Sequence, residues 1–91
     1  MTDKEIDKTL RDITARFGQV YPALKAAGTV NRVDVFLKNI GINHRSNYYK
    51  TLRGERALVL QHVVALIEIY KVYPDWLFFG KGNMFADKPS V

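Results

Sequence analysis

Apolar side chains recur along most of the chain at spacings of three and four residues, which is typical of helices with one buried face. The longest such stripe predicts a helical segment over about residues 2–27. It contains Ile6, Leu10, Ile13, Phe17, Val20 and Leu24. Because Pro22 lacks a backbone donor and its ring crowds the carbonyl of Gly18, we expect a kink or a break between Phe17 and Pro22.

Four shorter segments show the same spacing, over about residues 32–40, 46–53, 58–71 and 74–79. Glycines follow four of the five segments, as expected for residues that end helices in the left-handed conformation: Gly28, Gly41, Gly54 and Gly80. No segment alternates apolar and polar residues over the length of a strand. The pattern therefore predicts an all-α fold, a compact bundle of about five short helices whose first helix extends toward the N-terminus.

The segments at 32–40 and 46–53 are each predicted to bury one face. The buried side chains are expected to be Val33, Phe36, Leu37, Ile40, Tyr48 and Leu52. The expected capping residues are Asn31, with Asp34 in a capping-box position, for the first segment and Ser46 or Asn43 for the second. A tight turn starting at Gly41 joins the two, and Ile42 within it is expected to insert into the core.

The two C-terminal segments are strongly apolar. Segment 58–71 is apolar on most sides, so it should be either central or covered by a partner. Segment 74–79 begins with a proline suited to a first helical turn, and Trp76 and Leu77 are its expected core anchors. His62 is expected to be a satisfied core or interface residue and not a metal ligand.

The composition of the 91 residues fits one domain with a genuine core, because 47% of them are hydrophobic. The absence of cysteine excludes disulfides and thiolate metal sites. The N-terminus lacks the apolar region of a signal peptide, and no apolar run approaches the ~20 residues of a membrane helix, which together predict a cytoplasmic protein without a membrane partner.

Positive charge is concentrated in the middle of the chain. The net charge is +5, and residues 31–56 contribute six basic and two acidic side chains to it. The basic residues are Arg32, Lys38, Arg45, Lys50, Arg53 and Arg56, and the acidic ones are Asp34 and Glu55. A basic surface of this kind is what a polyanion-binding site requires.

Two motifs carry a family resemblance. "YKTLRGER" ends the segment at 46–53, and "YPDWLFFGKGNMF" closes the chain near residue 85. Together with the glycine that opens the turn, they resemble the phage-repressor-like (Cro/repressor) helix-turn-helix family of bacterial and phage regulators. The resemblance covers about residues 16–85. The turn is one residue longer than in the commonest family pattern, and residues 1–15 extend beyond the family's compact core.

The resemblance implies a DNA-binding domain over residues 16–86, an N-terminal helical extension over 1–15 and a tail over 87–91. It also implies sequence-specific binding of double-stranded DNA by a homodimeric transcriptional regulator of repressor type. The base-contacting positions fall on Arg45, Ser46, Asn47 and Lys50, with Tyr49 at their edge. The phosphate-contacting positions fall on Asn31, Arg32, Arg53 and Arg56, with His44 as a further candidate.

Other classes of function find little support in the residues. Asp3, Glu5, Asp7 and Asp12 have the distribution of a solvated helix face and not of paired catalytic carboxylates. Two histidines without cysteine give no metal-site spacing, so no enzyme activity, cofactor, metal or small-molecule effector is predicted. The alternative is a protein-interaction module on the same fold, an antitoxin-like or adaptor protein whose apolar helices bind a partner.

Overall fold

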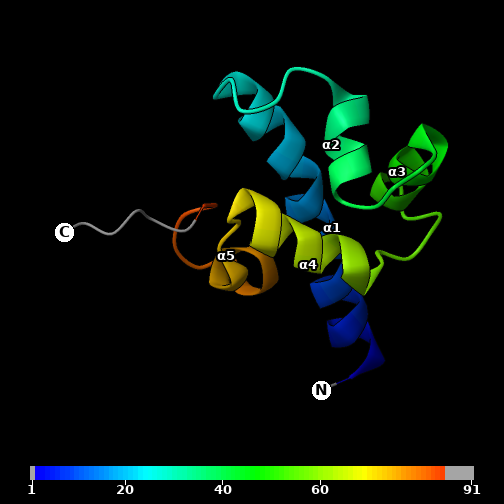
Figure 1. The fold of residues 1–91 in the computed structure, drawn as a ribbon. Coiled ribbons are helices and arrows are strands. Elements are labelled where there is room, and N and C mark those ends of the chain that lie inside the picture. Colours follow the sequence, from blue (N-terminus) through cyan, green and yellow to red (C-terminus); the bar gives the residue numbers. More distant parts are fainter. Residues whose placement is uncertain (1, 86–91) are drawn as a thin grey trace.

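The computed structural model describes residues 2–85, and this part of the chain forms five helices and no strand (Figure 1). The helices are α1 (Asp3–Ala26), α2 (Val33–Asn39), α3 (Arg45–Leu52), α4 (Leu60–Tyr70) and α5 (Pro74–Phe79). The predicted all-α class and the predicted number of helices are confirmed. The end of the predicted domain at residue 86 and the tail at 87–91 lie outside the described residues.

Helix α1 runs without a break through Pro22, so the predicted break is wrong. Its N-terminus is closed by a capping box in which Thr2 and Glu5 exchange hydrogen bonds between side chain and backbone. Phe17, Val20 and Leu24 lie on one stripe around the proline and are buried. Packing of this stripe offsets the loss of one backbone hydrogen bond, and the helix therefore continues.

The hydrophobic core is centred on α2. The ring of Phe36 is fully buried, and its centroid lies 5.2 Å from that of Tyr21, 6.2 Å from that of Tyr48 and 5.4 Å from that of Tyr70. These partners come from α1, α3 and α4, so one phenylalanine joins four helices. Of the side chains predicted to be buried in α2 and α3, Phe36, Leu37, Ile40 and Tyr48 are buried, whereas Val33 and Leu52 are partly buried.

The N-termini of α2 and α3 differ from the prediction. The N-cap residues are Arg32 and His44, and neither side chain caps its helix, so the expected caps Asn31, Ser46 and Asn43 are wrong. Asp34 takes no part in a capping box, because its carboxylate is bound by the guanidinium of Arg32. Predicted glycine helix ends are confirmed, since Gly28, Gly41, Gly54 and Gly80 all have positive φ.

Helix α4 packs against the core through Val63 and Leu66 but leaves Leu60, Val64 and Ile69 exposed. It is therefore a surface helix, with Leu60 and Val64 exposed on one side and Ile69 on the other, and not the central helix that its composition allowed. His62 is partly buried, and its Nδ1 lies 2.7 Å from the carbonyl oxygen of Ile40. Because a carbonyl only accepts, Nδ1 donates there and satisfies the C-terminal end of α2, as predicted for a packing histidine.

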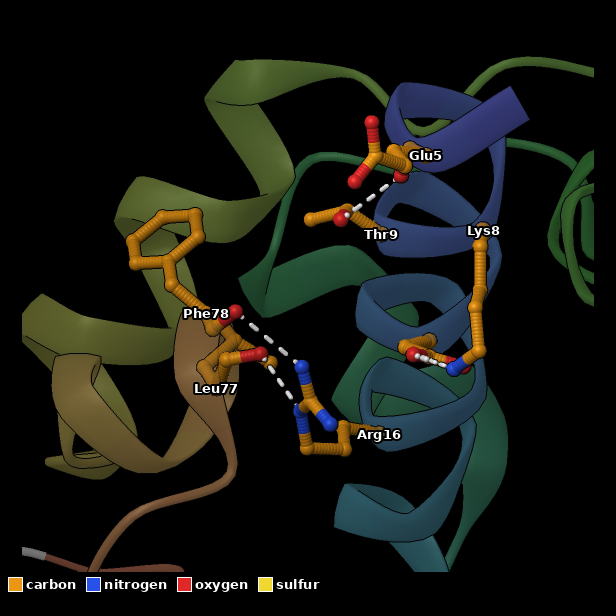
Figure 2. A network of polar contacts seen from close by, with 7 residues as sticks. Glu5, Lys8, Thr9, Arg16, Leu77 and Phe78 are labelled. Atoms are coloured by element: carbon orange, nitrogen blue, oxygen red, sulfur yellow. Dashed lines mark hydrogen bonds and ion pairs between the residues drawn. The ribbon is translucent and has the colours of Figure 1, made fainter. Parts of the chain in front are cut away.

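Helix α5 is held by an arginine from helix α1, which is distant in sequence. The Nε of Arg16 donates to the carbonyl of Leu77 at 2.8 Å, and its Nη2 donates to that of Phe78 at 3.1 Å (Figure 2). Both carbonyls lie in the last turn of α5, where carbonyl oxygens have no intrahelical N–H donor. After α5 the chain folds back to the start of this helix, where the N–H of Tyr73 donates to the carbonyl of Met84 at 2.8 Å.

Candidate nucleic-acid interface

The turn between α2 and α3 is fixed to the end of α2. Gly41 has φ +89°, and its N–H donates to the carbonyl of Lys38. The N–H of Ile42 donates to the carbonyl of Leu37 at 2.8 Å, which completes the Schellman pattern of a glycine-terminated helix. Ile42 is only 6% exposed, as predicted, so its side chain anchors the turn in the core. The start of α3 therefore has a defined position relative to α2.

Helix α3 has one buried and one exposed face. Tyr48 and Thr51 are buried and Leu52 is partly buried, and the Thr51 hydroxyl donates to the carbonyl of Asn47 at 2.9 Å. The opposite face consists of exposed side chains, which are Arg45, Ser46, Tyr49, Lys50 and, just beyond the helix, Arg53. With about 100° between successive residues, these five positions fall within a continuous arc. Four of the five residues predicted to contact bases lie on this arc.

Asn47 is the exception among the predicted base-contacting residues. It is only partly exposed and lies on the side of α3 opposite Tyr49. Its Oδ1 accepts a long hydrogen bond of 3.5 Å from Nη1 of Arg56. Both residues line a hollow of about 250 Å³ between the α2–α3 turn and the start of α4. Tyr49, expected only at the edge, lies at the middle of the exposed arc instead.

The exposed arc combines positive charge with an aromatic ring. Among the residues that the structure describes, Arg45 and Lys50 form no ion pair and no side-chain hydrogen bond, so both cations are available to a ligand. Tyr49 is 41% exposed, and its ring packs edge-on against the buried Tyr48 at a centroid distance of 5.2 Å. The Tyr48 side chain is buried, and this burial raises its pKa to about 12.

Two of the predicted phosphate-contacting arginines are bound to neighbouring carboxylates. Arg32 binds Asp34 through two hydrogen bonds of 3.0 and 2.9 Å, and Arg53 binds Glu55 through two of 2.7 and 3.3 Å. The hydrogen bonds donated by the guanidinium groups lower the pKa of Asp34 and of Glu55, and the bond that Arg53 donates to Glu55 raises the pKa of Arg53. The positive charge of nearby Lys50 lowers the pKa of Glu55 further.

The other predicted phosphate contacts, Asn31, His44 and Arg56, are exposed. Four of the predicted residues thus share the exposed face of α3, whereas Asn31 and Arg32 precede α2 and Arg53 and Arg56 follow α3. Sequence analysis missed the pairing of the arginines with Asp34 and Glu55. The signal was present as a repeated spacing, because "RVD" and "RGE" both place an acid two residues after an arginine.

Sites of other kinds were also sought in residues 2–85. No group of three or more histidine, cysteine or acidic residues is placed to hold a metal ion in this part of the chain. None of the five helices is long and apolar enough to cross a membrane. Comparisons of the chain with protein-family models, with curated proteins and with solved structures gave no significant match. The functional argument therefore depends on the geometry and chemistry of the chain itself.

Proposed function

We propose that the protein binds double-stranded DNA and regulates transcription, with α3 as the helix that enters the major groove. The observation that carries this proposal is the exposed arc of α3, on which Arg45 and Lys50 have no ion-pair partner within the described residues, while the opposite face of the helix is buried. A helix held in this way can present its polar side chains to base edges without loss of core packing. Repressor action is the form that the family resemblance suggests.

The residue types on the arc match the chemistry of the major groove. Arg45 can donate two hydrogen bonds to guanine O6 and N7, and Lys50 can donate to the same acceptors. Ser46 can donate or accept, and the ring of Tyr49 can pack on a thymine methyl group. His44 is the N-cap residue of α3, Arg56 follows the helix and Asn31 precedes α2; all three are exposed and could donate to phosphates beside the groove. Asn47 reaches a base only if its contact with Arg56 opens.

Fluorescence anisotropy with a labelled random duplex of about 20 base pairs tests this function directly. We expect micromolar dissociation constants near 0.1 M salt, since non-specific affinity is largely electrostatic. Each phosphate that a cation neutralises contributes about −0.9 to the slope of log K against log salt, so the slope should amount to several units. Absence of binding at 50 mM salt, or an affinity independent of salt, would contradict the proposal.

A protein-interaction module is the second candidate, and the open apolar surface favours it. Leu60 on α4 is 69% exposed and Phe79 on α5 is 68% exposed, which is unusual for side chains of this size. An adaptor or antitoxin-like protein would use this surface and would show no binding to duplex DNA at physiological salt. The anisotropy experiment therefore separates the two candidates.

We also propose that the protein forms a homodimer, because a single recognition helix contacts only a few base pairs. The α1 stripe supports this: Ile6 and Leu10 are exposed, so the N-terminal part of the stripe does not pack on its own domain. Their spacing of four residues fits the seam of a short helix pair. The exposed apolar residues of α4 and α5 offer further area for the same contact.

Replacing both Ile6 and Leu10 by glutamine should weaken dimerisation at least about tenfold, since each buried aliphatic side chain contributes about 1.5–3 kcal/mol. Sedimentation equilibrium measures the effect. The matched control is the Lys4→Gln, Arg11→Gln double variant, which changes exposed positions on the opposite side of α1. A wild-type protein that is monomeric at about 100 µM would exclude the dimer, and equal behaviour of both variants would exclude this stripe.

A further inference from the structure

Two arginine–carboxylate pairs of the same construction lie at the two ends of the α2–α3 unit. Arg32 and Asp34 open α2, and Arg53 and Glu55 follow α3, with two residues from arginine to acid in each case. Each guanidinium uses its Nε and its Nη2 to bind both oxygens of its carboxylate. Asp34 and Glu55 are also the only acidic residues within 31–56. Both acidic residues of this basic region are thus bound to arginines.

The pairs contribute little to stability. The side chains of Arg53 and Glu55 are 56% and 55% exposed, and those of Arg32 and Asp34 are also exposed. Exposed ion pairs of this kind stabilise a folded protein only weakly, because solvent screens the charges and two long side chains lose freedom. Their repeated, bidentate geometry therefore calls for a different explanation.

The backbone holds the second pair in place. Arg53 is the C-cap of α3, and Gly54 follows with φ +81°. The N–H of Glu55 then donates to the carbonyl of Lys50 at 2.9 Å, which folds the chain back against the end of the helix. The way in which α3 ends therefore places the Glu55 carboxylate beside the Arg53 guanidinium. At the first pair, the start of α2 places Asp34 beside Arg32.

A carboxylate and a phosphate compete for the same guanidinium fork, because each offers two oxygens in the same planar arrangement. We propose that Asp34 and Glu55 are internal stand-ins for DNA phosphates, occupying Arg32 and Arg53 in the free protein and lowering its affinity for all duplexes. This inference rests on the proposed DNA-binding function. DNA must displace the carboxylates before it gains these two contacts, so arbitrary DNA is held mainly by Lys38, Arg45, Lys50 and Arg56, which form no ion pair within residues 2–85.

The test is the affinity of Glu55→Gln and of Asp34→Asn for random and for preferred duplexes. Glutamine and asparagine keep the size of each side chain but remove the charge that holds the arginine. One further arginine–phosphate contact should tighten binding to both duplexes about three- to tenfold at 0.1 M salt and steepen the salt slope by up to about 0.9. The gain should shrink about threefold between 50 and 200 mM salt.

Two controls separate release of the arginine from a simple change of charge. Asp7→Asn removes one negative charge from an exposed position of α1, whose N-terminal end lies far from α2 in Figure 1. It should leave the affinity nearly unchanged. Glu55→Gln in an Arg53→Ala background should also gain nothing, because no arginine is left to release. Thermal unfolding of each variant should match the wild type, since all of these positions are exposed.

The outcomes distinguish the inference from the function on which it rests. If the wild-type protein and all variants fail to bind duplex DNA at low salt, the proposed function is wrong. If the wild type binds but Glu55→Gln and Asp34→Asn bind no better than Asp7→Asn, the stand-in proposal is wrong while the function stands. The stand-in proposal is also overturned if the gain persists without Arg53, because Glu55 would then act only by repelling DNA.

Discussion

The Arg45→Glu, Lys50→Glu double variant should bind duplex DNA about 100-fold more weakly than the wild-type protein. Each side chain is expected to contribute about 1–3 kcal/mol to a base or phosphate contact, and tenfold in affinity corresponds to about 1.4 kcal/mol. Because neither residue has an ion-pair partner within the described chain, reversal of their charges should leave the fold intact. Anisotropy measures the affinity, and circular dichroism the fold.

The Lys4→Glu, Arg11→Glu double variant is the matched control for this experiment. It changes the net charge by the same amount, but on exposed positions of α1 that lie outside the α2–α3 unit. We expect a loss of affinity of severalfold at most from long-range electrostatics, and this loss should vanish at high salt. An equal loss in both double variants would show that α3 has no special place in the interface.

Arg16→Met should lower the free energy of unfolding by about 2 kcal/mol, the largest effect on stability expected from a partly exposed position. The methionine keeps most of the aliphatic length but leaves the carbonyls of Leu77 and Phe78 without their donors. Hydrogen bonds to charged groups contribute about 1.5–3 kcal/mol, and partial hydration of the freed carbonyls reduces the loss. Urea unfolding monitored by circular dichroism provides the measurement.

Two further variants make this prediction specific. Arg11→Met changes an exposed arginine on the same helix and should alter stability by less than about 0.5 kcal/mol. Arg16→Lys should recover only part of the stability, because a lysine ammonium cannot reproduce the fork that binds two carbonyls. Full stability of Arg16→Met would mean that packing alone positions α5.

The helices could be predicted from the sequence because apolar spacing and glycine placement act locally. Segment 74–79 matches α5, and the other predicted helices agree with the observed ones to within a few residues. The capping residues could not be predicted in this way. Asn31 is a good capping residue in general, but the helix begins one residue later, with Arg32 as its N-cap residue and without a side-chain cap. Two neighbouring starts were locally acceptable, and local pattern does not choose between them.

The candidate site was only partly predictable for a similar reason. The exposure of Arg45, Tyr49 and Lys50 follows from the period of α3 once Tyr48 is assigned to the core. The partly buried position of Asn47 depends on Arg56, which lies beyond the helix, and on the start of α4. The contact between Arg16 and α5 spans more than 60 residues of chain, so no local sequence pattern predicts it.

The short length of α5 has a consequence for how the molecule opens. A helix of six residues has no stability of its own in water, so it persists only while Leu77 is buried and Arg16 holds its last turn. In hydrogen exchange, the amides of Leu77 and Gly80, which donate to the carbonyls of Tyr73 and Trp76, should therefore exchange through a local opening that leaves α2 and α3 folded. Such an opening would expose the apolar interior beside α4 while α3 kept its shape.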